Sequence, residues 1–345
     1  MRSEQRWLVL SDGARPTEDI YFLESVAPHL RSEGHEVGRL DVRGWRWRLA
    51  RWVLTRQPGA NLVLCRSLPE PVLRWLERER GAFGHIRYLI DDDLAAAAED
   101  ARLPAAYRAR MARAATQQPR LLALADEVVA CSTGLAERLR EDHGYVRVMT
   151  PPLISPLPDL VHFGIGRSAE QPWRIGFHGT RAHLADLEQI APALAALQRE
   201  RDDSELELML GQHAPPALVE LPRTYCPAPL PWPKFRDYQE RHRVHIGLAP
   251  LLDTPFNRGK SFIKFLDIAA MGGVGIYSRR APYTEIVEHG VNGLLADDDP
   301  AEWQHCIIWL LEHPDEALRI AQAAAKTATE HRCSAETAGV FVREG

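Results

Sequence analysis

Residues 244–299 of the chain read VHIGLAPLLDTPFNRGKSFIKFLDIAAMGGVGIYSRRAPYTEIVEHGVNGLLADDD. The apolar run 244–249 is typical of a buried strand, and a loop that contains proline follows it. A helix is then expected to begin at Lys260 and Ser261, and the second apolar run, 274–277, predicts another strand. Because free N–H groups at a helix start bind phosphate, this segment predicts a site for a nucleotide diphosphate.

The same alternation of strand and helix runs through the whole chain. Repeated units of this kind predict parallel sheets with helices on both faces. We therefore expect an α/β protein with two Rossmann-like, doubly wound domains that face each other across a cleft. The boundaries we expect are an N-terminal domain at 1–155, a proline-rich linker at 156–172, a C-terminal domain at 173–332, and a tail at 333–345 that packs back towards the N-terminal domain.

Composition limits the classes of function. The chain has 345 residues, of which 45% are hydrophobic and 26% charged, and its formal net charge of −5 disfavours nucleic-acid binding. Its five cysteines are scattered and form no CxxC pair, which favours reduced thiols over a disulfide framework. No apolar stretch approaches the roughly 20 residues of a membrane span. These features predict a cytoplasmic protein, or one attached peripherally to the inner face of a membrane.

The ordered motifs of the second half support a family resemblance. They are IGFHGTRAHLADL, MLG, PWPKFRDY, IGLAPL, FNRGKSFIKFLDIAAMGGVGIYS and APYTEIVEHGVNGLLADD. The chain resembles the retaining GT-B-fold glycosyltransferases of family 4 (glycosyl transferases group 1), most closely over residues 172–330. The resemblance implies sugar transfer from a nucleotide diphosphate-sugar donor to a glycan, lipid-linked or small-molecule acceptor, without a metal or other cofactor. The donor would bind the second domain and the acceptor the first, in polysaccharide or glycolipid biosynthesis.

The predicted helix after Gly259 supplies most of the expected donor site. Lys260, Lys264 and Asp267 share one face of it at i, i+4 and i+7. We expect Lys260, Ser261 and Lys264 to meet the diphosphate, with Arg258 assisting, and the resemblance implies that Asp267 binds the donor ribose. The alternative is a solvated helix face with a simple Lys–Asp pair.

One departure from the family pattern concerns the donor sugar. The family often carries two glutamates separated by seven residues, and here Gly259 and Asp267 occupy those positions. The acid that usually contacts the sugar is therefore replaced by glycine.

A second donor loop is expected after the strand at 174–178. Gly179 and Thr180 would expose N–H groups to a phosphate, and Arg181 would add charge. His183 and Asp186 match the HxxDL pattern of the resemblance, although helix capping with a local hydrogen bond explains the same pair.

Two further residues have competing interpretations. Tyr283 begins the segment after Ala281-Pro282, where it would reach the donor or pack in the core. Gly13 lies in the loop after the first strand, where relatives place a glycine near the donor phosphates, but a tight turn explains it equally simply.

The acidic triplet Asp91-Asp92-Asp93 ends the strand at 86–90. It is compatible with metal and diphosphate binding, with a role towards the acceptor, or with a helix start that favours acids. Since the second half resembles GT-B proteins, we expect Asp92 to face the acceptor where many relatives carry histidine. A raised pKa would suit Asp92 to accept a proton. Asp92 and Lys260 are thus the expected catalytic residues.

The segment 43–56, RGWRWRLARWVLTR, combines three tryptophans with five arginines. Such a mixture suits a membrane surface, an anionic acceptor, or a helix that packs on its own sheet with arginines outside.

Two rival functions stay open. A nucleotide-sugar epimerase can share this architecture, and a degenerate member can bind a nucleotide sugar without turnover.

Overall fold

The computed structural model describes residues 4–13, 15–165 and 167–333, and its strands form two six-stranded sheets. The strands of the first sheet are β1 (Arg6–Ser11), β2 (Glu36–Asp41), β3 (Asn61–Cys65), β4 (Ile86–Ile90), β5 (Glu127–Ala130) and β6 (Val146–Val148). Those of the second are β7 (Trp173–Phe177), β8 (Ser204–Leu208), β9 (Thr224–Tyr225), β10 (Ile246–Ala249), β11 (Val274–Ser278) and β12 (Leu294–Ala296).

Every pairing within these two sheets is parallel. The first sheet has the order β2-β1-β3-β4-β5-β6, and the second has β12-β11-β10-β7-β8-β9. The order reverses between β1 and β3 in the first sheet and between β7 and β10 in the second. Ligands of open parallel sheets bind beyond the strand ends at such switch points.

Helices connect the strands on both faces. In the first half they are α1 (Arg15–Glu18), α2 (Val26–Ser32), α3 (Arg46–Leu54), α4 (Glu70–Glu79), α5 (Leu94–Glu99), α6 (Ala105–Leu124) and α7 (Thr133–Leu139). In the second half they are α8 (Leu184–Glu200), α9 (Pro216–Val219), α10 (Trp232–Arg241), α11 (Pro255–Arg258), α12 (Ile263–Ala270), α13 (Pro300–Glu312) and α14 (Pro314–Glu330). Short 3-10 turns include η4 (Arg181–His183) and η6 (Tyr283–Glu285).

Each sheet is covered on both faces by apolar side chains. In β1, Leu8 and Leu10 belong to one core cluster, and Trp7 and Val9 belong to the cluster on the opposite face. This alternation follows from the two-residue period of a strand, and burial on both faces explains the continuous apolar strands seen in the sequence. In the second half, α8, α13 and the first turns of α14 supply one cluster, and α12 and the later turns of α14 supply the other.

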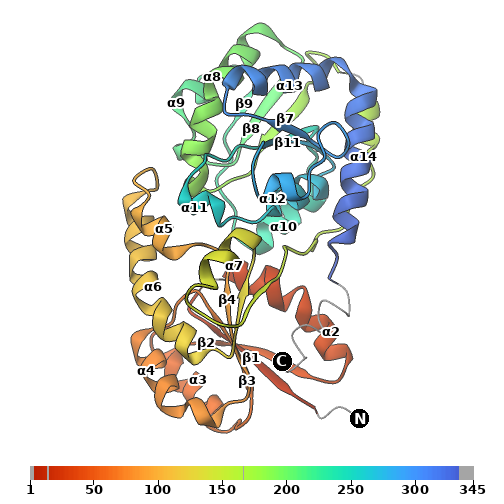
Figure 1. Ribbon diagram of the computed structural model, residues 1–345. Helices are drawn as coiled ribbons and strands as arrows, with labels where there is room; N and C mark the ends of the chain where they lie inside the picture. The colour runs from red at the N-terminus through yellow and green to blue at the C-terminus, as the bar shows by residue number, and fades with distance from the viewer. Residues whose placement is uncertain (1–3, 14, 166, 334–345) are drawn as a thin grey trace.

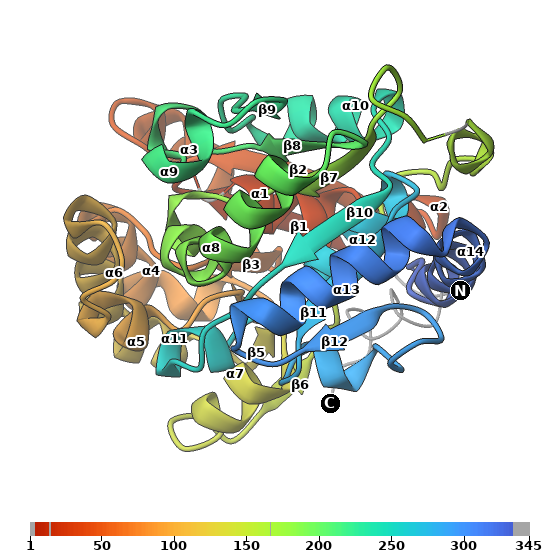
Figure 2. The ribbon, with the colours of Figure 1, turned by 90° about the horizontal axis from the view of Figure 1, so that it is seen from above.

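The two halves are stacked, as Figure 1 shows, with the second half above and α14 descending along one side towards the first. The view from above shows α13 and α14 on the C-terminal half (Figure 2). Contacts join the halves away from the cleft: Trp232 and Arg236 of α10 both donate to Glu24, at 3.2 and 2.9 Å. The amide of Leu153 also donates to the carbonyl of His331 at 2.9 Å.

Three local expectations need correction. The alanine- and arginine-rich segment after Asp93 predicts a single long helix, but it is broken into α5 and α6, since residues 100–104 are not helical. The helix expected to begin at Lys260 and Ser261 begins at Ile263. The acidic segment after β11 predicts a helix from its sequence, but it forms only the short turn η6.

Residues 334–345 of the expected tail lie outside the described residues. Within the described part, the carbonyl of Cys333 lies 3.0 Å from Nε2 of His29 in α2. Among the described helices, none is both long and apolar enough to cross a membrane.

Candidate active site

A cleft of about 1030 Å³ lies at the carboxyl ends of both sheets. Gly13 follows β1 and Arg66 follows β3, the two strands of the first switch point, and both line it. Thr180 follows β7 and Leu251 follows β10, at the second switch point, and they line it from the other side. Both sheets therefore direct their switch points into one cavity, where a ligand can contact both halves.

The structure brings together nine of the twelve residues predicted for the site. Those that line the cleft are Gly13, Asp92, Thr180, Arg181, His183, Lys260, Ser261, Lys264 and Tyr283. Gly179, Arg258 and Asp267 are not among the described residues that line it.

The start of α12 forms part of the cleft wall. Ile263 and Lys264, its first two residues, line the cavity. A serine at the expected helix start would cap the helix, but Ser261 does not, because α12 begins after Phe262 and has no side-chain cap. The Ser261 hydroxyl lies 3.0 Å from that of Tyr21 in the first half instead. This serine therefore connects the helix start to the opposite half.

The two expected catalytic residues form an ion pair across the cleft. Nζ of Lys260 donates to Oδ1 of Asp92 at 2.6 Å, and both side chains are largely buried. Burial alone would raise the pKa of Asp92, but the charges of Lys260 and Arg66 and the hydrogen bonds to it outweigh burial and lower the pKa to about 2. The expectation of a raised pKa is therefore wrong. Any phosphate that binds Lys260 must compete with Asp92.

Arg66 binds the carboxylates of both Asp91 and Asp92, and it was not among the residues predicted from the sequence. Its Nε and Nη2 donate to the two oxygens of Asp91 at 2.6 Å each, and Nη2 also donates to Asp92 at 2.9 Å. Its backbone has φ of 53°, a left-handed conformation that costs on the order of 1 kcal/mol or more outside glycine. The position of Arg66 just after a predicted strand was the one sequence signal that pointed to the site. No sequence signal predicted its left-handed backbone conformation.

Tyr107 of α6 completes the surroundings of Asp92. Its hydroxyl donates to Oδ2 of Asp92 at 3.2 Å. Burial, and then the negative charge of Asp92, raise the pKa of Tyr107 well above its usual value, so it stays a donor at neutral pH. Nothing in the sequence around Tyr107 distinguished it from a packing residue of a long helix.

The HxxDL pair fixes the loops around the donor side. Nδ1 of His183 lies 2.8 Å from one oxygen of Asp186. The other oxygen of Asp186 accepts from the amide of Leu252 and from Nδ2 of Asn257, each at 2.9 Å. Asp186 thus ties η4 to the loop before α12, and His183 is left facing the cleft.

The loop after β7 presents Thr180 and Arg181 to the cleft. The Thr180 hydroxyl accepts from the amide of Ala182 at 3.4 Å and so caps η4. Arg181 is exposed, and no acidic partner is found for it within the described residues. Gly179 is buried beneath this turn, where a Cβ would lie 2.7 Å from the ring of Phe177.

Tyr283 and Arg258 differ in their relation to the cleft. Tyr283 packs against Tyr277 with ring centroids 5.0 Å apart, yet it also lines the cavity. Arg258 lies outside and pairs with Asp253, at 2.9 Å from Nε. The Arg258 guanidinium therefore belongs to the protein surface in this conformation.

Asp267 lies one helical turn beyond the cleft wall. Its carboxylate accepts from Gln239 Nε2 at 2.8 Å and from Lys264 Nζ at 2.9 Å. Gly259 packs directly on the first half: its carbonyl accepts from the Ser132 hydroxyl at 2.8 Å, and a Cβ on it would lie 3.3 Å from Cβ of Asp93. A glutamate there would meet a like charge, which is a physical reason for the departure from the family pattern.

A second acid in the cleft differs from Asp92. Asp12 follows β1 and accepts from the Ser67 hydroxyl at 3.2 Å. Burial raises the pKa of Asp12, and the hydrogen bond from Ser67 and the charge of Arg43 only partly offset this. Asp12 is thus the carboxyl group of the cleft that binds a proton more readily than usual.

Within the described residues there is no group of three or more His, Cys, Asp or Glu side chains arranged to hold a metal ion. The carboxylates of Asp91 and Asp92 are instead neutralised by Arg66 and Lys260.

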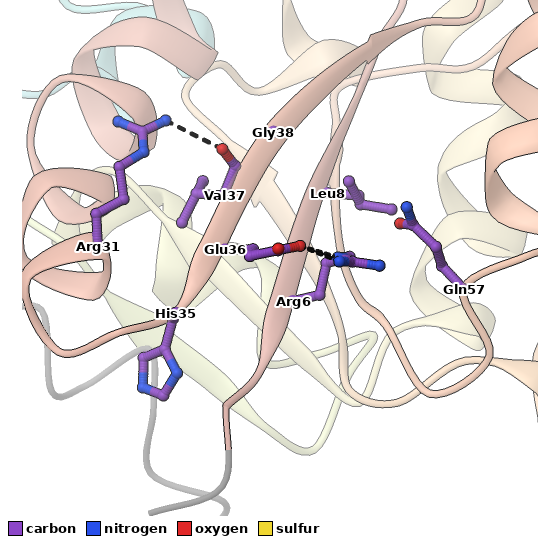
Figure 3. Close-up of a pocket in the computed structure, with 8 residues that line it drawn as sticks. All are labelled: Arg6, Leu8, Arg31, His35, Glu36, Val37, Gly38 and Gln57. Atoms are coloured by element: carbon purple, nitrogen blue, oxygen red, sulfur yellow. Dashed lines mark hydrogen bonds and ion pairs between the residues drawn. The ribbon is translucent and has the colours of Figure 1, made fainter.

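A separate hollow of about 410 Å³ lies beside the edge strand β2 (Figure 3). Arg6 pairs there with Glu36, and Arg31 donates to the carbonyl of Val37 at 3.1 Å. None of the residues predicted for the active site lines it.

Comparison with known proteins gives the architecture a family context. Residues 222–338 match a model of the glycosyl transferase-like family. No curated protein shows significant sequence similarity to the chain. The matched segment includes Lys260 and the start of α12 with Lys264.

Solved structures match over nearly the whole length. Sucrose-phosphate synthase from Thermosynechococcus elongatus is 14% identical with a TM-score of 0.69, and covers 98% of each chain. HepE of Anabaena, solved with UDP-glucose, is 14% identical with a TM-score of 0.63 and the same coverage. A putative UDP-N-acetylglucosamine 2-epimerase from Listeria monocytogenes is 12% identical, with a TM-score of 0.58 and coverage of 99% of this chain and 95% of its own. The predicted GT-B fold is confirmed, and the predicted resemblance to glycosyltransferases is confirmed over residues 222–338.

Proposed function

We propose that this chain, which has the GT-B fold and a glycosyl transferase-like C-terminal half, transfers a sugar from a nucleotide diphosphate-sugar to an acceptor held by its N-terminal half. The two parts of the reaction would meet in the cleft, at the Lys260–Asp92 pair. The donor would bind the wall formed by η4 and the start of α12, and the acceptor would bind the wall formed by α6 and the ends of β3 and β4.

The observation that carries the proposal is the position of the start of α12. This helix start and Lys264 line a cavity large enough for a nucleotide sugar, and Lys260, just before the helix, contacts Asp92 of the first half there. N–H groups at a helix start together with lysines suit a diphosphate leaving group, whose negative charge grows as the sugar departs. The proposed donor contacts are Lys260, Ser261 and Lys264, together with Thr180 and Arg181.

In the proposed reaction the bond between the anomeric carbon and the β-phosphate oxygen breaks. The acceptor hydroxyl forms the new bond to that carbon, with retention of configuration, and its proton passes to a phosphate oxygen on the same face. When Lys260 turns from Asp92 to the phosphate, the Asp92 carboxylate becomes free to orient the acceptor hydroxyl. Asp267 would bind the ribose, as the family resemblance implies, after exchange of one of its present partners.

A screen of nucleotide sugars tests the proposal. UDP-glucose is the first donor to use, because the structurally similar HepE was solved with it. Release of free nucleotide that increases when a glycan or lipid extract is added supports transfer. A changed sugar that stays attached to its nucleotide would identify an epimerase, and binding without any reaction would identify a degenerate protein.

We also propose a peripheral membrane contact through α3. Trp45, just before the helix, and Leu49 and Trp52 within it are 72, 59 and 53% exposed. Arg46 and Arg56 stack on the two tryptophans at 5.6 and 4.1 Å. Exposed aromatic rings flanked by arginines fit the interface of an anionic lipid surface.

Vesicle sedimentation tests this contact. The wild type is expected to sediment with phosphatidylcholine vesicles that contain phosphatidylglycerol, and Trp45→Ser/Trp52→Ser is expected to stay in solution. Val219→Ser/Tyr225→Ser, which also removes two exposed apolar residues, serves as the control. Equal sedimentation of all three proteins would rule α3 out as the contact.

A further inference from the structure

The wall of the cleft that belongs to the N-terminal half carries a row of polar side chains on α6. Tyr107, Arg110, Arg113 and Gln117 all line the cavity. Their spacing of three to four residues places them along one face of the helix. The proposed donor residues lie on other elements of the cleft, so this row belongs to the space left for the acceptor.

The two arginines of this row lack acidic partners. Arg66, Lys260 and Lys264 each pair with an aspartate, but neither Arg110 nor Arg113 forms an ion pair with any described residue. Glu70, the acid of the cleft on neighbouring α4, is already engaged by Arg120 at 2.9 Å.

Two guanidinium groups at i and i+3 also repel each other. Such a like-charged pair on a helix costs a few tenths of a kcal/mol when no anion lies between them. Six cationic and four acidic side chains line the whole cleft, in a chain whose formal net charge is −5. The cleft therefore carries an excess of positive charge, and the part of it on α6 is unpaired among the described residues.

A chain of contacts connects this row to the reacting groups. The guanidinium of Arg110 lies over the Tyr107 ring, 4.9 Å from its centroid. The Tyr107 hydroxyl donates to Asp92, which holds Lys260. An anionic group of the acceptor bound to Arg110 would therefore lie close to the place, beside Asp92, where the acceptor's own hydroxyl receives the sugar.

We propose that the acceptor carries a phosphate group that binds Arg110 and Arg113. Its role as acceptor rests on the proposed glycosyl transfer, whereas the anion site itself does not. The phosphate can belong to a soluble sugar phosphate or to a phosphorylated lipid headgroup, since both present the same oxygens to paired guanidiniums.

Titration calorimetry on the full chain tests the site without turnover. Two pairs of probes are compared. The first pair is glucose 6-phosphate and glucose. The second pair is phosphatidylcholine vesicles that contain phosphatidylinositol phosphate and the same vesicles without it. The protein is titrated both free and saturated with the nucleoside diphosphate that it binds best. At least one phosphorylated probe is expected to bind about tenfold more tightly than its neutral partner, and the pair that shows this identifies the source.

Matched variants decide which residues are responsible. Arg110→Gln/Arg113→Gln is expected to abolish the preference for the phosphorylated probe while leaving nucleotide affinity within about twofold. The control Arg78→Gln/Arg140→Gln removes two exposed charges outside the cleft and is expected to keep the preference. Melting temperatures show whether all variants fold.

Two results would overturn the inference: no wild-type preference in either pair of probes, or a preference that survives in Arg110→Gln/Arg113→Gln. The experiments distinguish failure of the phosphate-site proposal from failure of the proposed glycosyl transfer. If the phosphate preference maps to α6 but no nucleotide sugar reacts, the transferase proposal fails and the anion site stands. If sugars are transferred without any phosphate preference, only the anionic acceptor is lost.

Discussion

Replacing Asp92 is predicted to strengthen nucleotide binding even though it removes a proposed catalytic group. In the structure Lys260 is held by Asp92 at 2.6 Å, with both side chains largely buried. A diphosphate that uses Lys260 must first break this bond. Asp92→Asn keeps the size of the side chain but removes its charge, so Lys260 becomes available to the phosphate.

The size of the effect follows from the broken bond. A hydrogen bond between charged groups contributes about 1.5–3 kcal/mol. Only part of this reaches the nucleotide, because the amide oxygen introduced by the substitution would still accept a hydrogen bond from Lys260. We therefore expect Asp92→Asn to lower the Kd for the preferred nucleoside diphosphate about tenfold, or roughly 1.4 kcal/mol. Lys260→Gln is expected to raise the Kd by a similar factor, and adding Asp92→Asn to it should change little.

Titration calorimetry with UDP, GDP and ADP measures these affinities in all four proteins of the cycle. Sugar transfer by Asp92→Asn should fall although its nucleotide affinity rises, because Asp92 would no longer orient the acceptor. An unchanged or weaker nucleotide affinity in Asp92→Asn would refute the competition between phosphate and carboxylate. The competition would also be refuted if Asp92→Asn changed nucleotide affinity by the same factor in the wild type and in Lys260→Gln.

Three other predictions concern the interface, the ribose and pH. Gly134→Ala places a Cβ 2.3 Å from the carbonyl oxygen of Arg258 and should lower the free energy of unfolding by about 1–3 kcal/mol. Gly144→Ala, which has open space around its Cβ, is the control and should lower it little. Equal melting temperatures of the two variants would contradict the contact. Asp267→Asn should weaken the binding of a nucleoside diphosphate severalfold but leave the affinity for its 2′,3′-dideoxy analogue unchanged. Equal losses of affinity for both ligands would show that Asp267 does not bind the ribose. Because the pKa of Asp92 is lowered to about 2, its ionisation stabilises the fold above about pH 4 and this contribution, about 2 kcal/mol, disappears as the pH falls through 2. Chemical denaturation of wild type and Asp92→Asn should therefore give a difference in unfolding free energy that shrinks from about pH 4 downwards, and a pH-independent difference would contradict the ion pair.

The parallel sheets were predictable because their strands are buried on both faces. The strand predicted at 86–90 is β4, and residues 300–312, where Asp299-Pro300 followed by Glu302 predicts a helix start, form α13. Both have strong local signals, a mostly apolar run (IRYLI) in one and an Asp-Pro start in the other. The break between α5 and α6 had a weaker signal, since only Pro104 marks it.

The candidate site was predictable in part for a topological reason. Residues that follow parallel strands converge on one edge of a sheet, so Gly13 and Asp92 meet at the edge of the first sheet, and Thr180 and Leu251 meet at the edge of the second. The bond between Asp92 and Lys260 was not predictable. These residues are 168 positions apart, and their contact depends on how the two halves are docked.

Arg66 shows a second limit of sequence reasoning. Its left-handed backbone brings its guanidinium to Asp91 and Asp92, but arginine rarely adopts that conformation and nothing nearby in the sequence announces it. Ser261 shows a third: a serine before an amphipathic helix usually caps it. Here its hydroxyl instead meets Tyr21 from the opposite half.

The central claim is that the donor diphosphate binds at the start of α12. A crystal structure of the protein with a nucleoside diphosphate tests it most directly. We expect phosphate oxygens about 3 Å from Lys260 Nζ and from the first amides of α12, with the bond between Lys260 and Asp92 broken. A diphosphate bound elsewhere while Lys260 still contacts Asp92 would contradict the account.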